Sequence, residues 1–233
     1  MRHRVLACDF DGTLATEGVC ADATVEALEH VAATGIRLVL VTGRTREELA
    51  DVFDPGSLFE AIVFENGAVV LDVAADREQL LAPRVPNGLV AELQRLGVTP
   101  LVVGRVLCST AWSQEAKLSV AIAKLGIDRK VVRNRDSAMV LPPGISKRTG
   151  IEAALRAIGE LPSVTVAVGD GENDIPLFAV AGVSVAVANA VDALKARADV
   201  VLTEPNGRGV QALAAALVAG DLGALTALSP LAG

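Results

Sequence analysis

The sequence predicts an α/β protein, with a doubly wound, Rossmann-like parallel sheet as its core and a small α+β cap domain inserted into that core. Short apolar runs alternate with amphipathic, helix-like segments from the start of the chain, and this alternation is the signature of βαβ units. Several of the apolar runs end in polar segments that contain glycine, and open α/β sheets carry their sites at such strand ends. The alternation changes after residue 80 and resumes after residue 141, which predicts the insertion.

The first part of the core is predicted from the periodicity of its apolar residues. Strand-like runs are expected to alternate with helices and to finish in two strands joined by a tight turn. The expected strands are 4–8, 36–41, 61–64 and 68–71, and the expected helices are 23–33 and 46–53. Asn66-Gly67 lies between the last two runs, and Asn-Gly between apolar runs is a strong hairpin signal.

The middle of the chain is expected to form the cap, and the last part to complete the core. The cap should contain helices at 88–96 and 113–125 and strands at 101–110, 130–134 and 138–141. The returning core should contain a helix that starts at Lys147, strands at 163–168, 183–187 and 200–202, and a helix at 209–218. These elements predict a core of residues 1–80 and 142–220, a cap of residues 81–141, and a tail of residues 221–233 that shows no clear period.

Composition limits the classes of function. The 233 residues carry a net charge of −7, which argues against a nucleic-acid partner, because phosphate-backbone binding depends on clustered Lys and Arg. The longest stretch without a charged residue, 175–191, falls short of the ~20 residues that span a bilayer, so no membrane span is expected. A strand that begins near Met1 leaves no room for the apolar part of a signal peptide, and the three cysteines are too few and scattered for a disulfide framework. A cytoplasmic protein is expected.

Two carboxylates at the end of the first predicted strand are the first candidate catalytic groups. Asp9 and Asp11 follow the run 4–8 directly, and residues i and i+2 of a strand point to the same side. Such a pair is unfavourable unless a cation or a shared proton relieves the repulsion. Alternation places Cys8 on the opposite side of this strand, where a buried structural thiol is expected.

Further polar groups lie at the ends of three other predicted elements. Thr42-Gly43-Arg44 comes after the apolar run 38–41, Lys147 begins a helical pattern, and 169–174, with the sequence GDGEND, crowns the strand 163–168. Together with the segment 9–13, DFDGT, these four motifs resemble those of haloacid dehalogenase superfamily phosphatases. The insertion between the threonine and lysine motifs resembles the type IIB cap of Cof-like, sucrose-phosphate and small phosphoglycolate phosphatases. Relatives of one subclass also carry Asn-Gly at residues 66–67, so a loop near the substrate is the alternative to a plain turn.

The resemblance implies a mechanism for hydrolysis of phosphate monoesters. Asp9 would attack phosphorus and carry an aspartyl-phosphate, as carboxylates do in phosphoryl-transfer ATPases. Asp11 would protonate the leaving alkoxide and later act as the base on the hydrolytic water. Thr42 would donate its hydroxyl to a phosphoryl oxygen, and Lys147 would bridge Asp9 and the transferring group. The implied substrate-binding residues are Gly12, Thr42, Gly43, Arg44, Lys147 and Asn173. For Arg44 the residue pattern itself favours a solvated surface arginine over a phosphate contact.

The resemblance also implies a magnesium site. Its ligands would be the carboxylates of Asp9, Asp170 and Asp174 and the backbone carbonyl of Asp11, and hard oxygen ligands of this kind suit Mg²⁺. Helix capping is the alternative explanation for Asp170 and Asp174, because aspartate is a good N-cap residue. Glu172 would either support the metal site from outside or face solvent.

Substrate specificity is expected to come from the cap, because the core groups recognise only phosphate. The candidate cap residues are Arg105, Trp112, Arg133 and Arg135. An arginine would suit a carboxylate-bearing substrate such as phosphoglycolate, and a sugar phosphate is equally compatible. The expected partner is therefore a small phosphorylated metabolite, and the expected assembly is a monomer or a homodimer.

Three other functions fit parts of the pattern. A phosphotransferase or sugar phosphomutase of the same fold would pass the phosphoryl group to a second substrate, but such mutases usually carry a larger cap. A phosphoaccepting signalling domain also combines an acidic pair, Mg²⁺, Thr and Lys, but it is about half this length and has no insertion. A binding protein that has lost catalysis would usually lack a motif residue, and none is missing here.

Overall fold

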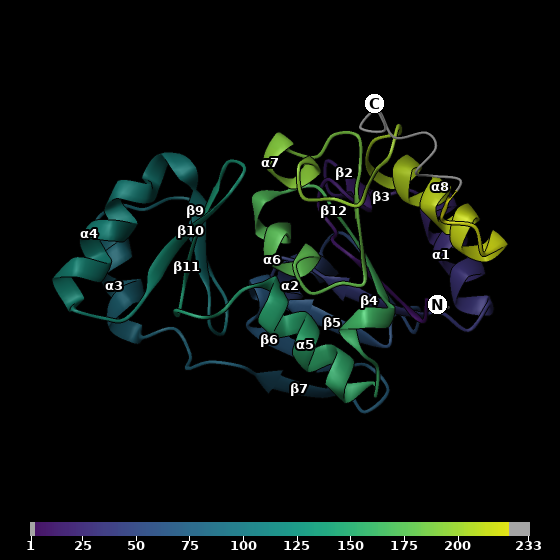
Figure 1. Ribbon diagram of the computed structural model, residues 1–233. Coiled ribbons are helices and arrows are strands. Elements are labelled where there is room, and N and C mark those ends of the chain that lie inside the picture. The colour runs from purple at the N-terminus through teal and green to yellow at the C-terminus, as the bar shows by residue number, and fades with distance from the viewer. Residues whose placement is uncertain (1–2, 224–233) are drawn as a thin grey trace.

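The computed structural model describes residues 3–223 and confirms the predicted α/β fold (Figure 1). Within these residues an eight-stranded sheet has the order β14-β13-β12-β1-β4-β5-β6-β7. Strand β1, Val5–Cys8, is central and pairs in parallel with both β12, Thr165–Gly169, and β4, Arg37–Val41. All four residues of β1 are buried, as expected for a parallel strand that is covered on both faces. The carboxyl ends of β1, β4 and β12 therefore meet at one edge of the sheet.

The remaining strands extend this sheet on both sides. On one side lie β13, Val183–Ala186, and β14, Val200–Val201, which continue the parallel pairing. On the other side β5, Ala61–Phe64, is parallel to β4, and β6, Val69–Asp72, and β7, Arg77–Leu80, are antiparallel. A separate two-stranded ribbon is formed by β2, Ala15–Thr16, and β3, Val19–Cys20. Sequence periodicity does not reveal β2, β3 and β7, because β2 and β3 have two residues each and β7 is polar.

Helices pack on the large sheet and bury its apolar faces. Helix α5, Lys147–Ala157, contacts β4, β5 and β6, and α1, Asp22–Ala33, packs against α8, Asn206–Ala219 (Figure 1). The shorter helices are α2, Arg46–Ala50, α6, Ile175–Phe178, and α7, Asp192–Lys195. None of the helices formed by residues 3–223 combines the length and the apolar character that a membrane crossing requires.

A second sheet, antiparallel and four-stranded, lies beside the large one (Figure 1). Its order is β10-β11-β9-β8, with β8 at Val102–Val103, β9 at Cys108–Ala111, β10 at Lys130–Asn134 and β11 at Ser137–Leu141. Helices α3, Asn87–Arg95, and α4, Glu115–Leu125, pack on it around Leu89, Leu93 and Leu118. We use "cap" for the segment 81–141 that contains these elements; its boundaries as a domain stay a prediction.

Three predicted elements differ from the structure. The expected strand 101–110 is two strands, β8 and β9, joined by a turn in which the N–H of Gly104 donates to the carbonyl of Leu107 over 2.8 Å. The expected helix 46–53 ends at Ala50. Asn66-Gly67 does not form a two-residue hairpin turn, because Glu65–Gly67 is a 3₁₀ turn and the strands close with Phe64 opposite Val69. Of the predicted tail 221–233, only 221–223 belongs to the described residues.

Candidate active site

Three carboxylates converge at the carboxyl edge of the large sheet. Asp9 follows β1 and Asp170 follows β12, while Asp174 ends the 3₁₀ turn Glu172–Asp174. One oxygen from each carboxylate lies within 4.8 Å of the others, and the three residues are 5%, 2% and 0% exposed. Asp174 also accepts the backbone N–H groups of Asp170 and Gly171 through Oδ2, at 3.0 and 2.9 Å. Asp174 therefore both shapes the loop and contributes charge to the cluster.

Lys147 lies against this cluster and is completely buried. Its Nζ donates to Oδ1 of Asp174 over 2.6 Å and also to Oδ1 of Asp9. A cation in the first turn of a helix is disfavoured by the helix dipole, so the carboxylates must provide the attraction that holds the ammonium group there. The sequence motifs thus predict residues that the fold brings together from β1, β12 and the start of α5.

Burial and mutual repulsion shift the pKa values of the cluster. Burial, followed by the charges of Asp174 and Asp170, raises the pKa of Asp9 well above its usual value, against the opposing effect of Lys147. Burial and Asp174 likewise raise the pKa of Asp170, which Arg135 partly opposes. Burial alone would lower the pKa of Lys147, but Asp174 and Asp9 together raise it. Lys147 and Arg135 therefore do not fully compensate the burial and mutual repulsion of the three carboxylates.

The donor set fits a hard divalent cation. Three carboxylates that share a small buried volume attract such an ion, because oxygen ligands suit Mg²⁺ and Ca²⁺ and the ion relieves the like-charge repulsion. Soft thiolate ligation does not compete: Cys8 is buried as predicted, and burial raises the pKa of its thiol. Helix capping explains only part of what these two residues do. Oδ2 of Asp174 accepts the N–H groups of Asp170 and Gly171 at the start of the 3₁₀ turn. Oδ1 of Asp174 accepts from Lys147, and the Asp170 carboxylate accepts from Thr13 and Arg135.

Asp11 does not contribute its side chain to this cluster. Its carboxylate, which is 43% exposed, forms a bidentate ion pair with Arg44, with Nε to Oδ2 and Nη2 to Oδ1 both at 2.7 Å. Arg44 also donates through Nη1 to the carbonyl of Glu48 over 3.2 Å, and its guanidinium lies 5.5 Å from the centre of the Phe10 ring. Arg44 is thus not a solvated surface residue, and in this structure its anionic partner is Asp11.

Thr42 and Asn173 have partners within the fold. The buried Thr42 accepts the N–H of Arg44 through Oγ1 over 3.1 Å, and a hydroxyl that accepts one bond still has a proton to donate. Thr45, not Thr42, is the N-cap of α2. Asn173 donates through Nδ2 to Oδ1 of Asn66 over 3.1 Å. The predicted substrate contact of Asn173 therefore stays a prediction, and its observed contact connects the acidic loop to the turn after β5.

The four candidate specificity residues of the cap have different positions. Arg135 reaches the acidic cluster, where its Nη2 donates to Oδ2 of Asp170 and, over 3.1 Å, to the carbonyl of Asn189. Arg133 stacks on Trp112, with 4.8 Å between the guanidinium carbon and the ring centre. Arg105 pairs with Glu78 at 2.8 Å. Only Arg135 of these four lines the cavity described next.

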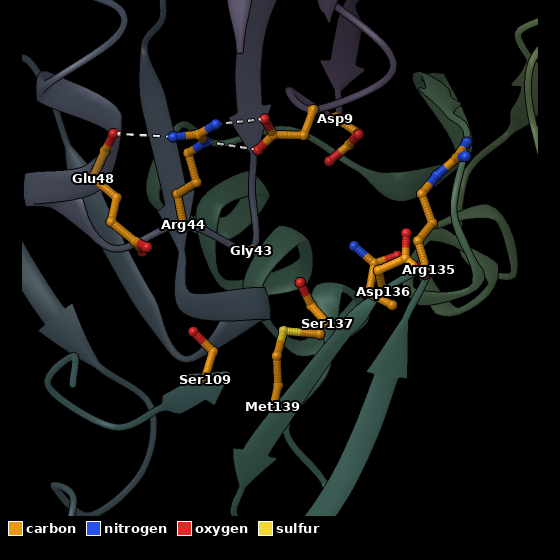
Figure 2. Close-up of a pocket in the computed structure, with 11 residues that line it drawn as sticks. Asp9, Gly43, Arg44, Glu48, Ser109, Arg135, Asp136, Ser137 and Met139 are labelled. Atoms are coloured by element: carbon orange, nitrogen blue, oxygen red, sulfur yellow. Dashed lines mark hydrogen bonds and ion pairs between the residues drawn. The ribbon is translucent and has the colours of Figure 1, made fainter. Parts of the chain in front are cut away.

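A cavity of about 390 Å³ opens above Asp9, between the large sheet and the cap. Figure 2 shows Arg44 and Glu48 on one side of it and Arg135, Asp136 and Ser137 on another. Ser109 of β9 and its strand partner Met139 of β11 come from the cap as well. The complete lining consists of Asp9, Asp11, Gly43, Arg44, Glu48, Ser109, Asn134, Arg135, Asp136, Ser137 and Met139.

Several contacts around the site were not predicted from the sequence. Glu172 neither joins the cluster nor faces solvent alone, because its Oε2 accepts the backbone N–H of Arg135 over 3.2 Å. Thr13 donates through Oγ1 to Asp170 over 3.2 Å, and Asn189 donates to the carbonyl of Gly12 over 2.8 Å. Gly12 itself lies against Asp170, where a Cβ atom would be 2.3 Å from Oδ2. The period-two alternation of the cap strands predicts which of their residues lie on the same face of the sheet. It does not predict which face lines the cavity.

A doubly wound sheet with a buried acidic cluster and a buried lysine beneath a cap defines an α/β enzyme built to handle phosphate groups. Comparison with known families agrees. The model of the haloacid dehalogenase-like hydrolases matches residues 6–96 and 110–213, and the chain belongs to this family. It is a phosphatase of the family.

Curated relatives support this assignment. "Phosphoglycolate phosphatase 2" of Saccharolobus solfataricus is 30% identical over 226 residues, which cover 94% of each chain. A phosphoglycolate phosphatase of Sulfurisphaera tokodaii is 32% identical over 211 residues, covering 87% of this chain and 88% of that protein.

Two solved structures share the fold. A haloacid dehalogenase-like hydrolase from Bacteroides thetaiotaomicron superposes with a TM-score of 0.76 at 21% identity, covering 92% of this chain and 99% of the other. A sugar phosphatase of haloacid dehalogenase subclass IIB has a TM-score of 0.68 at 22% identity, with coverage of 85% and 93%.

The raised pKa values predict how pH and metal affect stability. Some carboxylic acids have a higher pKa in the folded state than the unfolded value of about 3.9. Such a group makes the fold progressively less stable as pH rises from the unfolded pKa to the folded pKa. We therefore expect Asp170→Asn, in metal-free buffer, to gain stability relative to wild type as pH rises above about 4. Urea unfolding at several pH values measures this difference.

Added Mg²⁺ should reverse that order. It should stabilise the wild type at pH 7 by about 2–3 kcal/mol at a hundredfold excess over the dissociation constant, and Asp170→Asn by less. Equal stabilisation of both proteins would contradict the assignment of Asp170 to the cation site.

Proposed function

We propose that this chain is a Mg²⁺-dependent phosphatase that hydrolyses small phosphate monoesters through an aspartyl-phosphate on Asp9. The observation that carries the proposal is the placement of Asp9. Its carboxylate lies at the floor of the cavity, hydrogen-bonded to the buried Lys147 and within 4.8 Å of the carboxylate oxygens of Asp170 and Asp174. A nucleophilic carboxylate, a phosphate-binding cation and a metal site are thereby supplied in one place.

Each chemical step has a candidate group. An oxygen of Asp9 forms a bond to phosphorus while the bond from phosphorus to the ester oxygen breaks, and Asp11 gives its proton to the departing alkoxide. Water then attacks phosphorus and loses a proton to Asp11, which releases inorganic phosphate and restores Asp9. Asp11 lies on the cavity wall. Both of its oxygens accept from Arg44 in this structure, so Asp11 would have to release Arg44 in order to take up the proton that it gives to the leaving group.

Phosphate binding would involve groups that follow β1 and β4 and the first residue of α5. The ammonium group of Lys147 and the hydroxyl of Thr42 would contact phosphoryl oxygens, helped by the backbone around Gly12 and Gly43. Both side chains are buried beneath the cavity in this structure, so these contacts would require a local rearrangement when phosphate enters. Asp9, Asp170, Asp174 and the carbonyl of Asp11 would hold Mg²⁺, which would neutralise charge on the transferring group. Uncatalysed monoester hydrolysis is so slow that enhancements of up to ~10²¹-fold are known, so this concentration of charge is chemically necessary.

The substrate class is a small phosphorylated metabolite. Phosphoglycolate is supported by the two phosphoglycolate phosphatases that are 30% and 32% identical to this chain. Arg135 on the cavity wall offers a partner for a carboxylate. A sugar phosphate is supported by the hydroxyl groups of Ser109 and Ser137, which line the same cavity. Both classes are compatible with about 390 Å³ of space.

The proposal is tested by phosphate release from a panel of substrates. The panel contains phosphoglycolate, hexose phosphates, nucleotides and p-nitrophenyl phosphate, each with Mg²⁺ and with EDTA. Metal-dependent release that is fastest for phosphoglycolate or a sugar phosphate is the expected result. Release that persists in EDTA, or transfer of phosphate to an added sugar in place of water, would contradict it.

A further inference from the structure

Glu65 is a core residue whose buried carboxylate points into the cap. It directly follows β5 and is 2% exposed. Its Oε1 accepts the backbone N–H of Arg105 over 2.8 Å, and its Oε2 accepts those of Val106 and Leu107 over 2.8 and 2.9 Å. These three amides form the turn between β8 and β9. The proposed catalytic steps do not use Glu65, so its burial needs another explanation.

Packing alone does not explain a carboxylate at this position. A buried carboxylate is unfavourable unless hydrogen bonds replace its hydration, and here three converging N–H groups replace it. The fit is close, since a Cβ atom on the neighbouring Gly104 would lie 2.6 Å from the Glu65 carboxylate. Such an arrangement holds one specific backbone conformation of the cap against the core, because every bond requires the amides of three successive residues to point at one side chain.

The turn that carries Glu65 also contacts the catalytic loops. The N–H of Glu65 donates to the carbonyl of Arg44 over 2.9 Å, and that of Asn66 donates to the carbonyl of Thr42 over 3.0 Å. The Asn66 side chain accepts from Asn173 in the acidic loop. Gly67, with φ of +101°, lies so close to the residue before Lys147 that a Cβ atom would be 1.8 Å from the Ser146 carbonyl oxygen. The turn is therefore fixed to the segments that position the catalytic groups.

The cap turn that Glu65 holds leads directly to the cavity. Strand β9 begins one residue after Leu107, and its Ser109 lines the cavity opposite Asp9. On the other side of this turn, Arg105 accepts the N–H of Val85 over 2.9 Å, and Val106 accepts a hydrogen bond from Arg129 over 2.8 Å. Arg129 also bonds the carbonyls of Pro83 and Arg84 in the connection from core to cap. Glu65 thus acts where the cap leaves the core.

We propose that Glu65 is a positioning residue that fixes the cap over the phosphate site, and so determines which leaving groups the cavity accepts. It does not line the cavity; it places β9 and, through β9, its partner strand β11. The kinetic part of this inference rests on the proposed phosphatase function. The structural part, that the Glu65 carboxylate holds the turn 104–107, does not.

The test combines Glu65→Gln with a matched control in the cap. Glutamine keeps the size of the side chain but presents an NH₂ group to at least one of the three amide donors. Glu92→Gln is the control, because Glu92 is also a buried glutamate, 7% exposed, whose partners Arg95 and Lys124 both belong to the cap. Gly104→Ala is a second variant, in which the added methyl group pushes the turn away from an unchanged Glu65.

Two readouts are measured on the full chain. Hydrogen exchange of the amides of Arg105, Val106 and Leu107 should become about tenfold faster in Glu65→Gln and Gly104→Ala, and should be unchanged in Glu92→Gln. The ratio of kcat/KM for the best substrate of the panel to that for p-nitrophenyl phosphate should fall by about tenfold in the first two variants only. This ratio does not depend on the fraction of protein that is folded.

The inference is overturned if exchange of the three amides is unchanged in Glu65→Gln and Gly104→Ala, or if Glu92→Gln lowers the substrate ratio equally. If Glu65→Gln does not fold, Gly104→Ala decides by the same criteria. A wild type that releases no phosphate would refute the proposed function, and accelerated exchange in the two variants would still support the structural role of Glu65 in holding the turn 104–107.

Discussion

Asp9→Asn should abolish phosphate release, with a loss on the order of 10⁴-fold or more, as for the removal of other covalent nucleophiles. An amide oxygen is a far poorer nucleophile than a carboxylate, and no other acid can take its place, because Asp170 and Asp174 are engaged by Thr13, Arg135 and backbone amides. The substitution also removes one of three mutually repelling buried charges. We therefore expect the inactive variant to be folded and no less stable than the wild type in metal-free buffer.

The measurement pairs turnover with detection of the intermediate. Wild type quenched in acid during turnover should show one phosphoryl adduct by mass spectrometry, and Asp9→Asn should show none. Asp128→Asn, a substitution of an exposed aspartate in the cap, is the control and should retain wild-type turnover. Turnover of Asp9→Asn within tenfold of wild type, measured on protein free of deamidated product, would eliminate Asp9 as the nucleophile.

The fold could be predicted largely from the sequence because most core strands are buried on both faces. Strand β1, expected at 4–8, is found at Val5–Cys8, and β5 is found where it was expected, at Ala61–Phe64. The failure at 101–110 has an identifiable cause. The carboxylate of Glu65, about 40 residues earlier in the chain, accepts hydrogen bonds from the backbone N–H groups of Arg105, Val106 and Leu107. These residues form the turn that divides the expected strand, and local propensity contains no information about so distant an acceptor.

The candidate site divides in the same way. Asp9 and the loop with Asp170 and Asp174 follow predicted parallel strands, whose carboxyl ends meet at one edge of the sheet, so their convergence could be anticipated. Lys147 begins a predicted helix, and its place at the site was implied by the resemblance of the four motifs. The pairing of Arg44 with Asp11 and of Asn173 with Asn66 could not be anticipated. These contacts join residues 33 and 107 positions apart, and they depend on side-chain orientation at a crowded edge, which the order of elements does not determine.

Lys147→Met should have the largest effect on stability. Lys147 is 0% exposed and is the ammonium partner of both Asp9 and Asp174. Methionine fills a similar volume but leaves these carboxylates without their cation, and removing one partner of a buried ion pair destabilises by about 3–5 kcal/mol. We expect that loss in metal-free buffer at pH 7, measured by urea unfolding, together with a fall in kcat on the order of 10³-fold.

Lys124→Met is the matched control. Lys124 also pairs with a buried glutamate, Glu92, at 2.8 Å, but is itself half exposed, so solvent screens the pair and its removal should alter stability by no more than about 1 kcal/mol. A similar loss of stability in both variants would mean that burial of Lys147 is not the reason for the effect.

A double substitution separates charge from packing at Lys147. If the loss of stability in Lys147→Met arises from uncompensated negative charge, then adding Asp174→Asn should recover part of that stability. The second substitution removes one charge, and asparagine can still accept hydrogen bonds from the N–H groups of Asp170 and Gly171. Added Mg²⁺ should also stabilise Lys147→Met more than wild type, because the ion finds a cluster with a larger excess of negative charge. If neither change restores stability, the lysine stabilises the site through its shape, and the electrostatic account of the cluster is wrong.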